Sequence, residues 1–198
     1  MPSSTADLLR RQTTPYLAAG VAAGVLVVAM LLMGRHVWCE CRVPRLFVAN
    51  PGTSHSSQHI ADWYSVSHLL HGVVFYFAFL SIRSRFGNGW HLAAAIALEV
   101  AWEIFENTPF VINRYREATA AFGYSGDSIV NAVGDVAFCL LGFVVAAKIG
   151  WRWSIALFVA AEVVMILAIR DSLLLNVLML VWPLDAIREW QGAGISGG

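Results

Sequence analysis

The chain has 198 residues, of which 58% are hydrophobic and only 13% are charged, whereas soluble domains are roughly 45–50% apolar and about 25% charged. A water-soluble domain is therefore excluded, because too few polar residues are available to cover its surface. The formal net charge is zero and the 13 Lys and Arg residues are scattered, which excludes a basic surface for nucleic acid. The composition predicts an all-α fold, a polytopic transmembrane bundle of about five to six helices in one integral membrane domain over residues 1–198.

The first predicted helix follows a polar N-terminus at residues 1–16. Residues 17–34 are apolar without interruption and no small-x-small cleavage site follows them, so they predict a signal anchor that stays attached. Gly20 and Gly24 lie in this helix at the GxxxG spacing, which permits close approach of two helices. Residues 35–61 then form an extramembrane loop.

Four more hydrophobic segments follow that loop, and each is long and apolar enough to cross the hydrocarbon core of a bilayer. They comprise residues 65–82, 90–112, 128–147 and 153–169. Tryptophans near several of the segment starts are typical of the membrane interface.

The last apolar segment, residues 172–184, is short and ends near Pro183. It could be a half-span or an interfacial helix, although we favour a sixth span. Residues 185–198 predict a polar C-terminal tail.

Carboxylates lie within the predicted spans, where no Lys or Arg is present to neutralise them. They are Glu99, Glu103, Glu106, Asp135 and Glu162. An ionised carboxylate in hydrocarbon costs at least about 2.5–3.5 kcal/mol on insertion scales. Each of these groups must therefore be protonated, hydrated in a cavity, or paired with a cation or a hydrogen-bond donor.

Polar side chains also share one face on each of three consecutive helices, because they are spaced by three or four residues. The three sets are His68 and His71; Glu99, Glu103 and Glu106; and Asp127, Asn131 and Asp135. The start of the second helix, the end of the third and the start of the fourth face the same leaflet, so the three sets should converge there. The sequence predicts an intramembrane functional cluster; the alternative is a hydrogen-bonded network that only fixes helix packing.

Two kinds of chemistry fit this cluster, and the sequence leaves both open. As metal ligands, imidazoles and carboxylates suit a divalent metal such as zinc, manganese or iron, and the expected ligands are His68, His71, Glu99, Glu103 and Asp135. As acid–base groups, crowded carboxylates would share a proton. The expected catalytic residues are Glu103, Glu106, His71, Asp135, Asn131 and Asp127.

The 35–61 loop carries a second group of reactive side chains, on the same side of the membrane as the cluster. Cys39 and Cys41 flank Glu40, and His36, His55 and His59 lie in the same loop. A CxC pair beside histidines can bind a soft metal or act as a redox pair, whereas a disulfide between the two cysteines would be strained. Cys139 lies alone on the fourth predicted helix and indicates packing.

A Gly-Tyr-Ser-Gly run at residues 123–126 is similar to the GxSG around the nucleophile of rhomboid intramembrane proteases. In that family the basic histidine lies in a later helix, yet every histidine here precedes Ser125. The order argues against a protease. The run instead predicts a turn that leads to Asp127 or Ser128 as the N-cap of the next helix.

Several motifs together resemble one bacterial inner-membrane family, known as domain of unknown function two-five-eight-five. They are Trp-Cys-Glu-Cys at 38–41, Ser-His-Leu-Leu-His-Gly at 67–72, Glu-Val-Ala-Trp-Glu-Ile-Phe-Glu-Asn-Thr at 99–108, and Gly-Tyr-Ser-Gly-Asp-Ser at 123–128. The resemblance covers nearly the whole chain. It implies a multi-pass protein of the bacterial inner membrane and implies no activity. The Asp127 to Asp135 pattern, with the preceding His and Glu, is more distantly similar to VanZ-like membrane proteins.

Three functional hypotheses follow. The first is an intramembrane enzyme, metal-dependent or not, that acts on the headgroup of a membrane lipid or a lipid-linked substrate. The second is a proton- or cation-coupled transporter, for which inverted repeats are expected and none is visible in the sequence. The third is a non-catalytic accessory protein whose polar core is structural.

Overall fold

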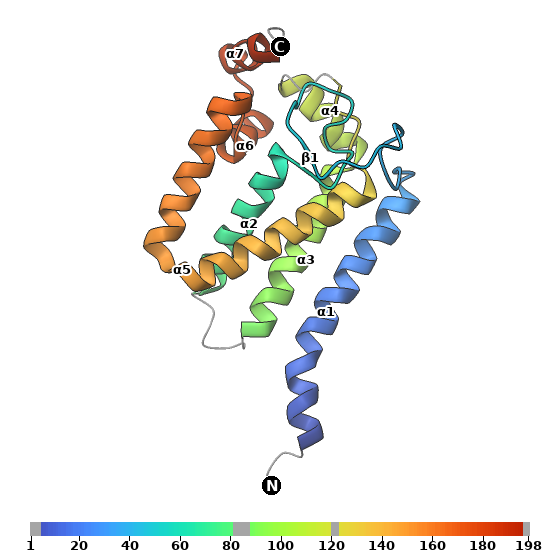
Figure 1. Cartoon of the computed structure of the whole chain (residues 1–198), viewed down its shortest axis with the longest axis vertical. Coiled ribbons are helices and arrows are strands. Elements are labelled where there is room, and N and C mark those ends of the chain that lie inside the picture. The colour runs from blue at the N-terminus through green and yellow to red at the C-terminus, as the bar shows by residue number, and fades with distance from the viewer. Residues whose placement is uncertain (1–4, 81–87, 120–122, 196–198) are drawn as a thin grey trace.

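The computed structural model describes residues 5–80, 88–119 and 123–195, and within these ranges the chain is almost entirely helical (Figure 1). The predicted all-α class is confirmed. The helices are α1 (Thr5–Leu32), α2 (Trp63–Leu80), α3 (Asn88–Glu106), α4 (Pro109–Ala118), α5 (Ile129–Ile169), α6 (Leu173–Val181) and α7 (Asp185–Ile195). Two short parallel strands, β1 (Phe47–Val48) and β2 (Ala61–Asp62), pair within the long loop, with Phe47 opposite Ala61.

Three of these helices are long and apolar enough to cross a membrane: Thr13–Leu32 within α1, Trp63–Leu80 and Ile129–Ile169. The outward face of α1 shows the pattern expected for contact with lipid. Its exposed apolar side chains recur every three or four residues, at Leu17, Val21, Val25, Val28 and Leu32, and so form one continuous stripe. The count of five to six spans stays a prediction.

The ends of the chain differ from the sequence-based expectation. Helix α1 begins at Thr5, so most of the predicted polar N-terminus is helical. Helix α6 has only nine residues, which at 1.5 Å per residue is roughly 13 Å and too short to cross a core of about 30 Å. A full sixth span at residues 172–184 is therefore wrong. The predicted C-terminal tail contains helix α7.

Helix α5 consists of two arms that meet at Gly150. This glycine has φ 75° and ψ 173°, outside the helical region, and Figure 1 shows the arms joined at a sharp bend. The predicted separation of the 128–147 and 153–169 segments is thus confirmed. Only glycine adopts this backbone conformation without strain, so the bend is encoded locally.

The third predicted helix is interrupted near its end. Helix α3 ends at Glu106, and α4 begins at Pro109 after an N-cap at Thr108, whose hydroxyl accepts a hydrogen bond from the Val111 N–H at 3.4 Å. A Thr N-cap followed by Pro at the first helical position is a strong start signal. The expected continuous helix over 90–112 is wrong for this local reason.

Helices α2 and α5 approach each other at backbone distance. A Cβ added to Gly72 would overlap the carbonyl oxygen of Cys139, and one added to Gly142 would overlap the carbonyl oxygen of Leu69. The contact is therefore reciprocal and requires glycine on both helices. Gly20 and Gly24 differ, because an added Cβ would meet no described atom within 4 Å.

Replacing Gly72 by Ala should destabilise the protein by roughly 1–3 kcal/mol, because the added methyl forces α2 and α5 apart. The measurement is thermal unfolding of the purified protein in detergent. Gly24→Ala is the matched control: it adds the same methyl to a helix where nothing opposes it, and stability should hold or rise. Equal melting temperatures for the two variants would contradict the close α2–α5 contact.

Candidate functional site

The predicted cluster is centred on His68 of α2, which is 6% exposed. Its Nδ1 lies 2.6 Å from Glu99 Oε1 and 3.1 Å from Glu103 Oε1. Both carboxylates come from α3 and are fully buried. Only Glu99 forms a hydrogen bond with this nitrogen; neither oxygen of Glu103 has a hydrogen-bond partner among the described residues.

His71 lies one turn further along α2 and contacts the same glutamate. Its Nδ1 is 3.1 Å from Glu99 Oε2 and 3.3 Å from Glu99 Oε1. Glu99 therefore bridges two imidazoles, which gives the buried carboxylate hydrogen-bond partners without Lys or Arg. The matched spacings of the two helices produce this arrangement, because both sets of residues step by one helical turn.

Asp135 of α5 approaches the opposite side of the His68 ring. Its Oδ2 lies 3.9 Å from His68 Nε2, and its Oδ1 has no hydrogen-bond partner among the described residues. The five predicted metal ligands thus form two overlapping groups whose donor atoms lie within 4.8 Å of one another: His68, His71 and Glu99; and His68, Glu103 and Asp135. The predicted convergence of the three helices is confirmed.

A cavity of about 250 Å³ opens beside this cluster. Four residues of the predicted set line it: His68, Glu106, Asp127 and Asp135. The long loop provides one wall through residues 51–54, 56 and 57. Pockets for drug-sized molecules are usually 300–1,000 Å³, so this space suits a small polar group.

Asp127 is held by a reciprocal pair of hydrogen bonds with Asn107, at the break between α3 and α4. Asn107 Nδ2 donates to Asp127 Oδ2 at 2.6 Å, and the Asp127 N–H donates to Asn107 Oδ1 at 2.8 Å. The Tyr124 hydroxyl donates to the same carboxylate at 3.1 Å. Burial raises the pKa of Asp127, while the hydrogen bond from Asn107 acts in the opposite direction.

Arg35, just after α1, fastens these loops together. Its guanidinium donates to the carbonyl oxygens of Ser125 and Asn107, the latter at 2.6 Å. Gly126 lies against this guanidinium with φ 92°, so neither the backbone conformation nor the space permits a side chain there. The predicted turn at residues 123–128 is confirmed, with Ser128 as the N-cap of α5.

Asn131, which was predicted as a cluster residue, does not join the cluster, and Glu162, the remaining carboxylate of the predicted spans, lies apart from it. The side chain of Asn131 donates to the carbonyl oxygen of His59 at 2.9 Å and so fastens the loop to α5. Glu162 Oε2 accepts a hydrogen bond from the Leu174 N–H at 3.3 Å, in the first turn of α6. A carboxylate is favourable at a helix N-terminus, so this contact stabilises the start of α6.

Several cavity-lining residues were not predicted from the sequence. They are Tyr64, Tyr115, Tyr124, Asp171, Asn176 and Gln191. Asp171 accepts hydrogen bonds from the Ser172 N–H at 2.9 Å and from Gln191 Nε2 at 3.1 Å, and burial raises its pKa to about 6. An acid directly after a hydrophobic segment was the available signal, but Asp171 lies in the short connection between two predicted spans, residues 153–169 and 172–184.

Comparison with known proteins identifies one family. The family described as protein of unknown function (DUF2585) matches residues 30–193. Similar proteins named UPF0314 protein occur in Paracoccus denitrificans (43% identical, covering 94% of this chain and 96% of the relative) and Novosphingobium aromaticivorans (44%, covering 89% and 92%). Another occurs in Sphingopyxis alaskensis (44%, covering 91% and 96%). No solved structure matches significantly.

The Asn107–Asp127 pair predicts a pH-dependent variant. Asn107→Asp keeps the acceptor for the Asp127 N–H but replaces the donor by a second carboxylate, so the variant should lose roughly 1–3 kcal/mol at neutral pH. Two adjacent carboxylates raise each other's pKa, and burial already raises that of Asp127. The loss should therefore shrink as pH falls, once one carboxyl holds a proton and donates again.

The measurement is melting temperature against pH in detergent. Asn50→Asp, in an exposed turn of the loop, is the control and should show little change at any pH. A destabilisation of Asn107→Asp that does not depend on pH would contradict the paired-carboxylate explanation.

Proposed function

The chain belongs to the DUF2585 family, and we propose that it is a membrane-embedded enzyme that acts on the polar headgroup of a lipid or of a lipid-linked molecule. One observation carries the proposal: buried carboxylate oxygens of Glu103, Glu106 and Asp135 lack hydrogen-bond partners among the described residues, although they surround His68 and the cavity. Buried polar atoms are normally satisfied. Unsatisfied ones beside a cavity are typical of groups that complete their contacts with a proton, a cation or a substrate.

The proposed location is the bacterial inner membrane, with five crossings. Helices α1 and α2 and the two arms of α5 supply four of them. Helix α3, with 19 residues, is roughly 28 Å long. We assign it the fifth crossing, because Glu99 and Glu103 are buried within the bundle and Glu106 lines the cavity, so these glutamates do not face lipid. The cavity then lies toward one leaflet, beside the 35–61 loop.

In the proposed mechanism His68 transfers the proton. Glu99 accepts a hydrogen bond from His68 Nδ1, which fixes the tautomer and leaves Nε2 free to accept a proton, as the carboxylate of a catalytic triad does for its histidine. Nε2 faces Asp135, at the wall of the cavity. A hydroxyl or a water molecule in the cavity would therefore meet a base flanked by carboxylates that stabilise the resulting imidazolium.

The geometry disfavours a metal ion held jointly by His68, Glu103 and Asp135. Glu103 lies beside Nδ1 of His68, whereas Asp135 lies beside Nε2. A single metal ion cannot use both nitrogens of one ring. The 3.9 Å between Nε2 and Asp135 Oδ2 also exceeds the roughly 3–3.4 Å between donors that bonds of about 2.0–2.2 Å impose.

The cavity lining indicates the class of headgroup. It includes Glu106, Asp127, Asp135 and Asp171 with three tyrosines, and no Lys or Arg is among the described lining residues. An acidic lining disfavours a bare phosphate and favours an amine or the hydroxyls of a sugar. Its volume holds such a group, while the acyl chains remain in the bilayer.

His68→Gln should fold normally yet lower activity by roughly 10²–10⁴-fold, the usual contribution of a general acid–base group. Glu103→Gln should likewise fold, because it removes a buried charge, and should also lose function. The measurement is the lipid profile, by mass spectrometry, of a deletion strain that carries each variant. We expect both variants to reproduce the profile of the deletion, while the wild-type gene restores it.

The matched controls are His36→Gln and Glu117→Gln, which change the same residue types at exposed positions and should restore the profile fully. Detergent melting curves confirm that each variant is folded. A deletion that leaves the lipid profile unchanged would contradict the proposed substrate class. Full restoration of the wild-type lipid profile by His68→Gln would contradict the proposed mechanism.

A further inference from the structure

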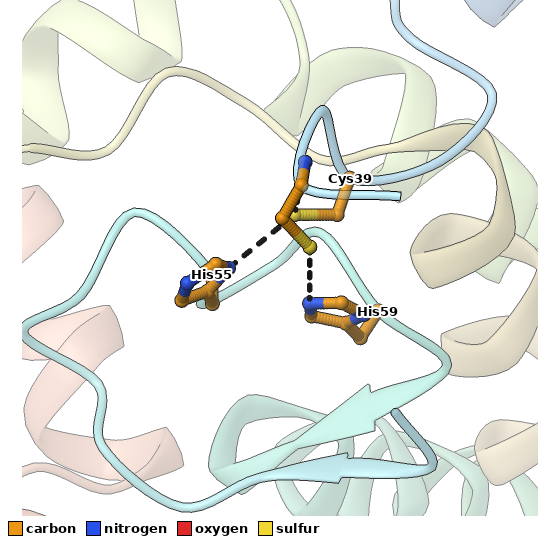
Figure 2. A group of neighbouring side chains, drawn as sticks. Cys39, His55 and His59 are labelled. Atoms are coloured by element: carbon orange, nitrogen blue, oxygen red, sulfur yellow. Dashed lines mark hydrogen bonds between the residues drawn. The ribbon is translucent and has the colours of Figure 1, made fainter. Parts of the chain in front are cut away.

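A second group of reactive side chains converges in the long loop, apart from the His68 cluster. Figure 2 shows Cys39, His55 and His59 around one point, and Cys41 belongs to the same group: donor atoms of all four lie within 4.8 Å of one another. Cys39 Sγ is 3.3 Å from His55 Nδ1, and Cys41 Sγ is 3.8 Å from His59 Nε2.

These distances match the edges of a metal tetrahedron. With Zn–S bonds of about 2.3 Å and Zn–N bonds of about 2.0–2.1 Å, tetrahedral donors lie roughly 3.3–3.8 Å apart. Each histidine presents one nitrogen to one sulfur. The backbone N–H of Cys41 donates to Cys39 Sγ at 3.4 Å, which is a contact that favours a thiolate.

The burial of His59 is an independent observation. Its side chain is 1% exposed, yet its Nδ1 has no hydrogen-bond partner among the described residues, and its Nε2 meets only the weak acceptor Cys41 Sγ. Buried imidazoles normally have stronger partners. Its Nε2 faces Cys41 Sγ, so a metal ion held by that sulfur would give this nitrogen a stronger partner.

We propose that Cys39, Cys41, His55 and His59 bind one Zn²⁺ ion as a structural site. Two thiols and two neutral imidazoles form the tetrahedral Cys₂His₂ set that zinc prefers. Binding converts both thiols to thiolates and releases their two protons to solvent. All four positions are protein ligands, so no position remains for a substrate.

The site would fix the loop that forms a wall of the cavity. Thirteen residues separate Cys41 from His55, and they include the lining residues Pro51 to Ser54. Closing such a segment through a metal removes conformational freedom from its unfolded state. The zinc site thus holds the loop without taking part in the chemistry at His68.

The test is the zinc content of the full-length protein, purified in detergent without chelators, together with the absorption spectrum after replacement of zinc by Co²⁺. We expect about one zinc per chain, and a sulfur-to-cobalt charge-transfer band with the strong visible bands of tetrahedral Co²⁺. Cys41→Ser and His55→Ala, both partly exposed positions, should each lose most of the zinc.

Cys139→Ala and His36→Ala are the matched controls and should keep the zinc, as should His68→Gln, which separates this site from the proposed active site. The wild-type cobalt spectrum is decisive even where a variant fails to fold. A wild-type protein without zinc and without the charge-transfer band would overturn the proposal. A protein mass two hydrogens below that of the fully reduced chain would also overturn it, because it indicates a Cys39–Cys41 disulfide. Full zinc content in both Cys41→Ser and His55→Ala would overturn it as well.

Discussion

The fold depends on one constraint: ionisable groups buried among apolar helices need partners, because apolar surroundings offer none. Glu99 meets this constraint by lying between His68 and His71, which fixes α2 against α3. The glycine contacts between α2 and α5 then allow Asp135 to reach the other nitrogen of His68. The carboxylates that these pairs leave unsatisfied lie around one imidazole. The same packing that solves the burial problem for Glu99 therefore concentrates reactive groups at His68.

The long loop completes this architecture from outside the bundle. Three of its carbonyl oxygens accept hydrogen bonds from the backbone N–H groups at the start of α5. The pairs are Ser128 with Ser57, Ile129 with His36 and Val130 with Val37. The N-terminal N–H groups of a helix have no partner within the helix, so the loop supplies what α5 lacks. Gln58 adds a side-chain bond to the carbonyl oxygen of Gly126 at 2.8 Å. Loop and helix are consequently one structural unit.

The sequence predicted the cluster because residue spacing and the alternating direction of successive helices are enough to place it. A spacing of three or four residues assigns His68 and Glu99 to faces, and alternation of helix direction assigns those faces to one leaflet. It could not exclude Asn131, which shares the spacing but bonds to a backbone group of the loop, and it gave no partner for Glu162, which bonds to a backbone group of α6. Those partners are fixed by tertiary contacts, and no local pattern reports them. Thr108 and Pro109 were a local signal for the break between α3 and α4, but the apolar residues that follow them favoured one continuous helix.

The charge of the cavity and the position of its loop wall arise from different bonds. Charge at the cavity arises from Asp127, Asp135 and their neighbours, which are held by bonds within the bundle and by Asn107. The loop wall is held by the Ser57 N–H bond to Asp62 Oδ2 at 2.7 Å, and the Cys and His group lies beside it, with His55 and His59 on either side of Ser57. The cavity lining includes residues of both sets, among them Asp127, Asp135 and Ser57. Because backbone bonds join the loop to the start of α5, a displacement of the loop wall acts on α5, whereas the Glu99 bridge between α2 and α3 contains no loop residue.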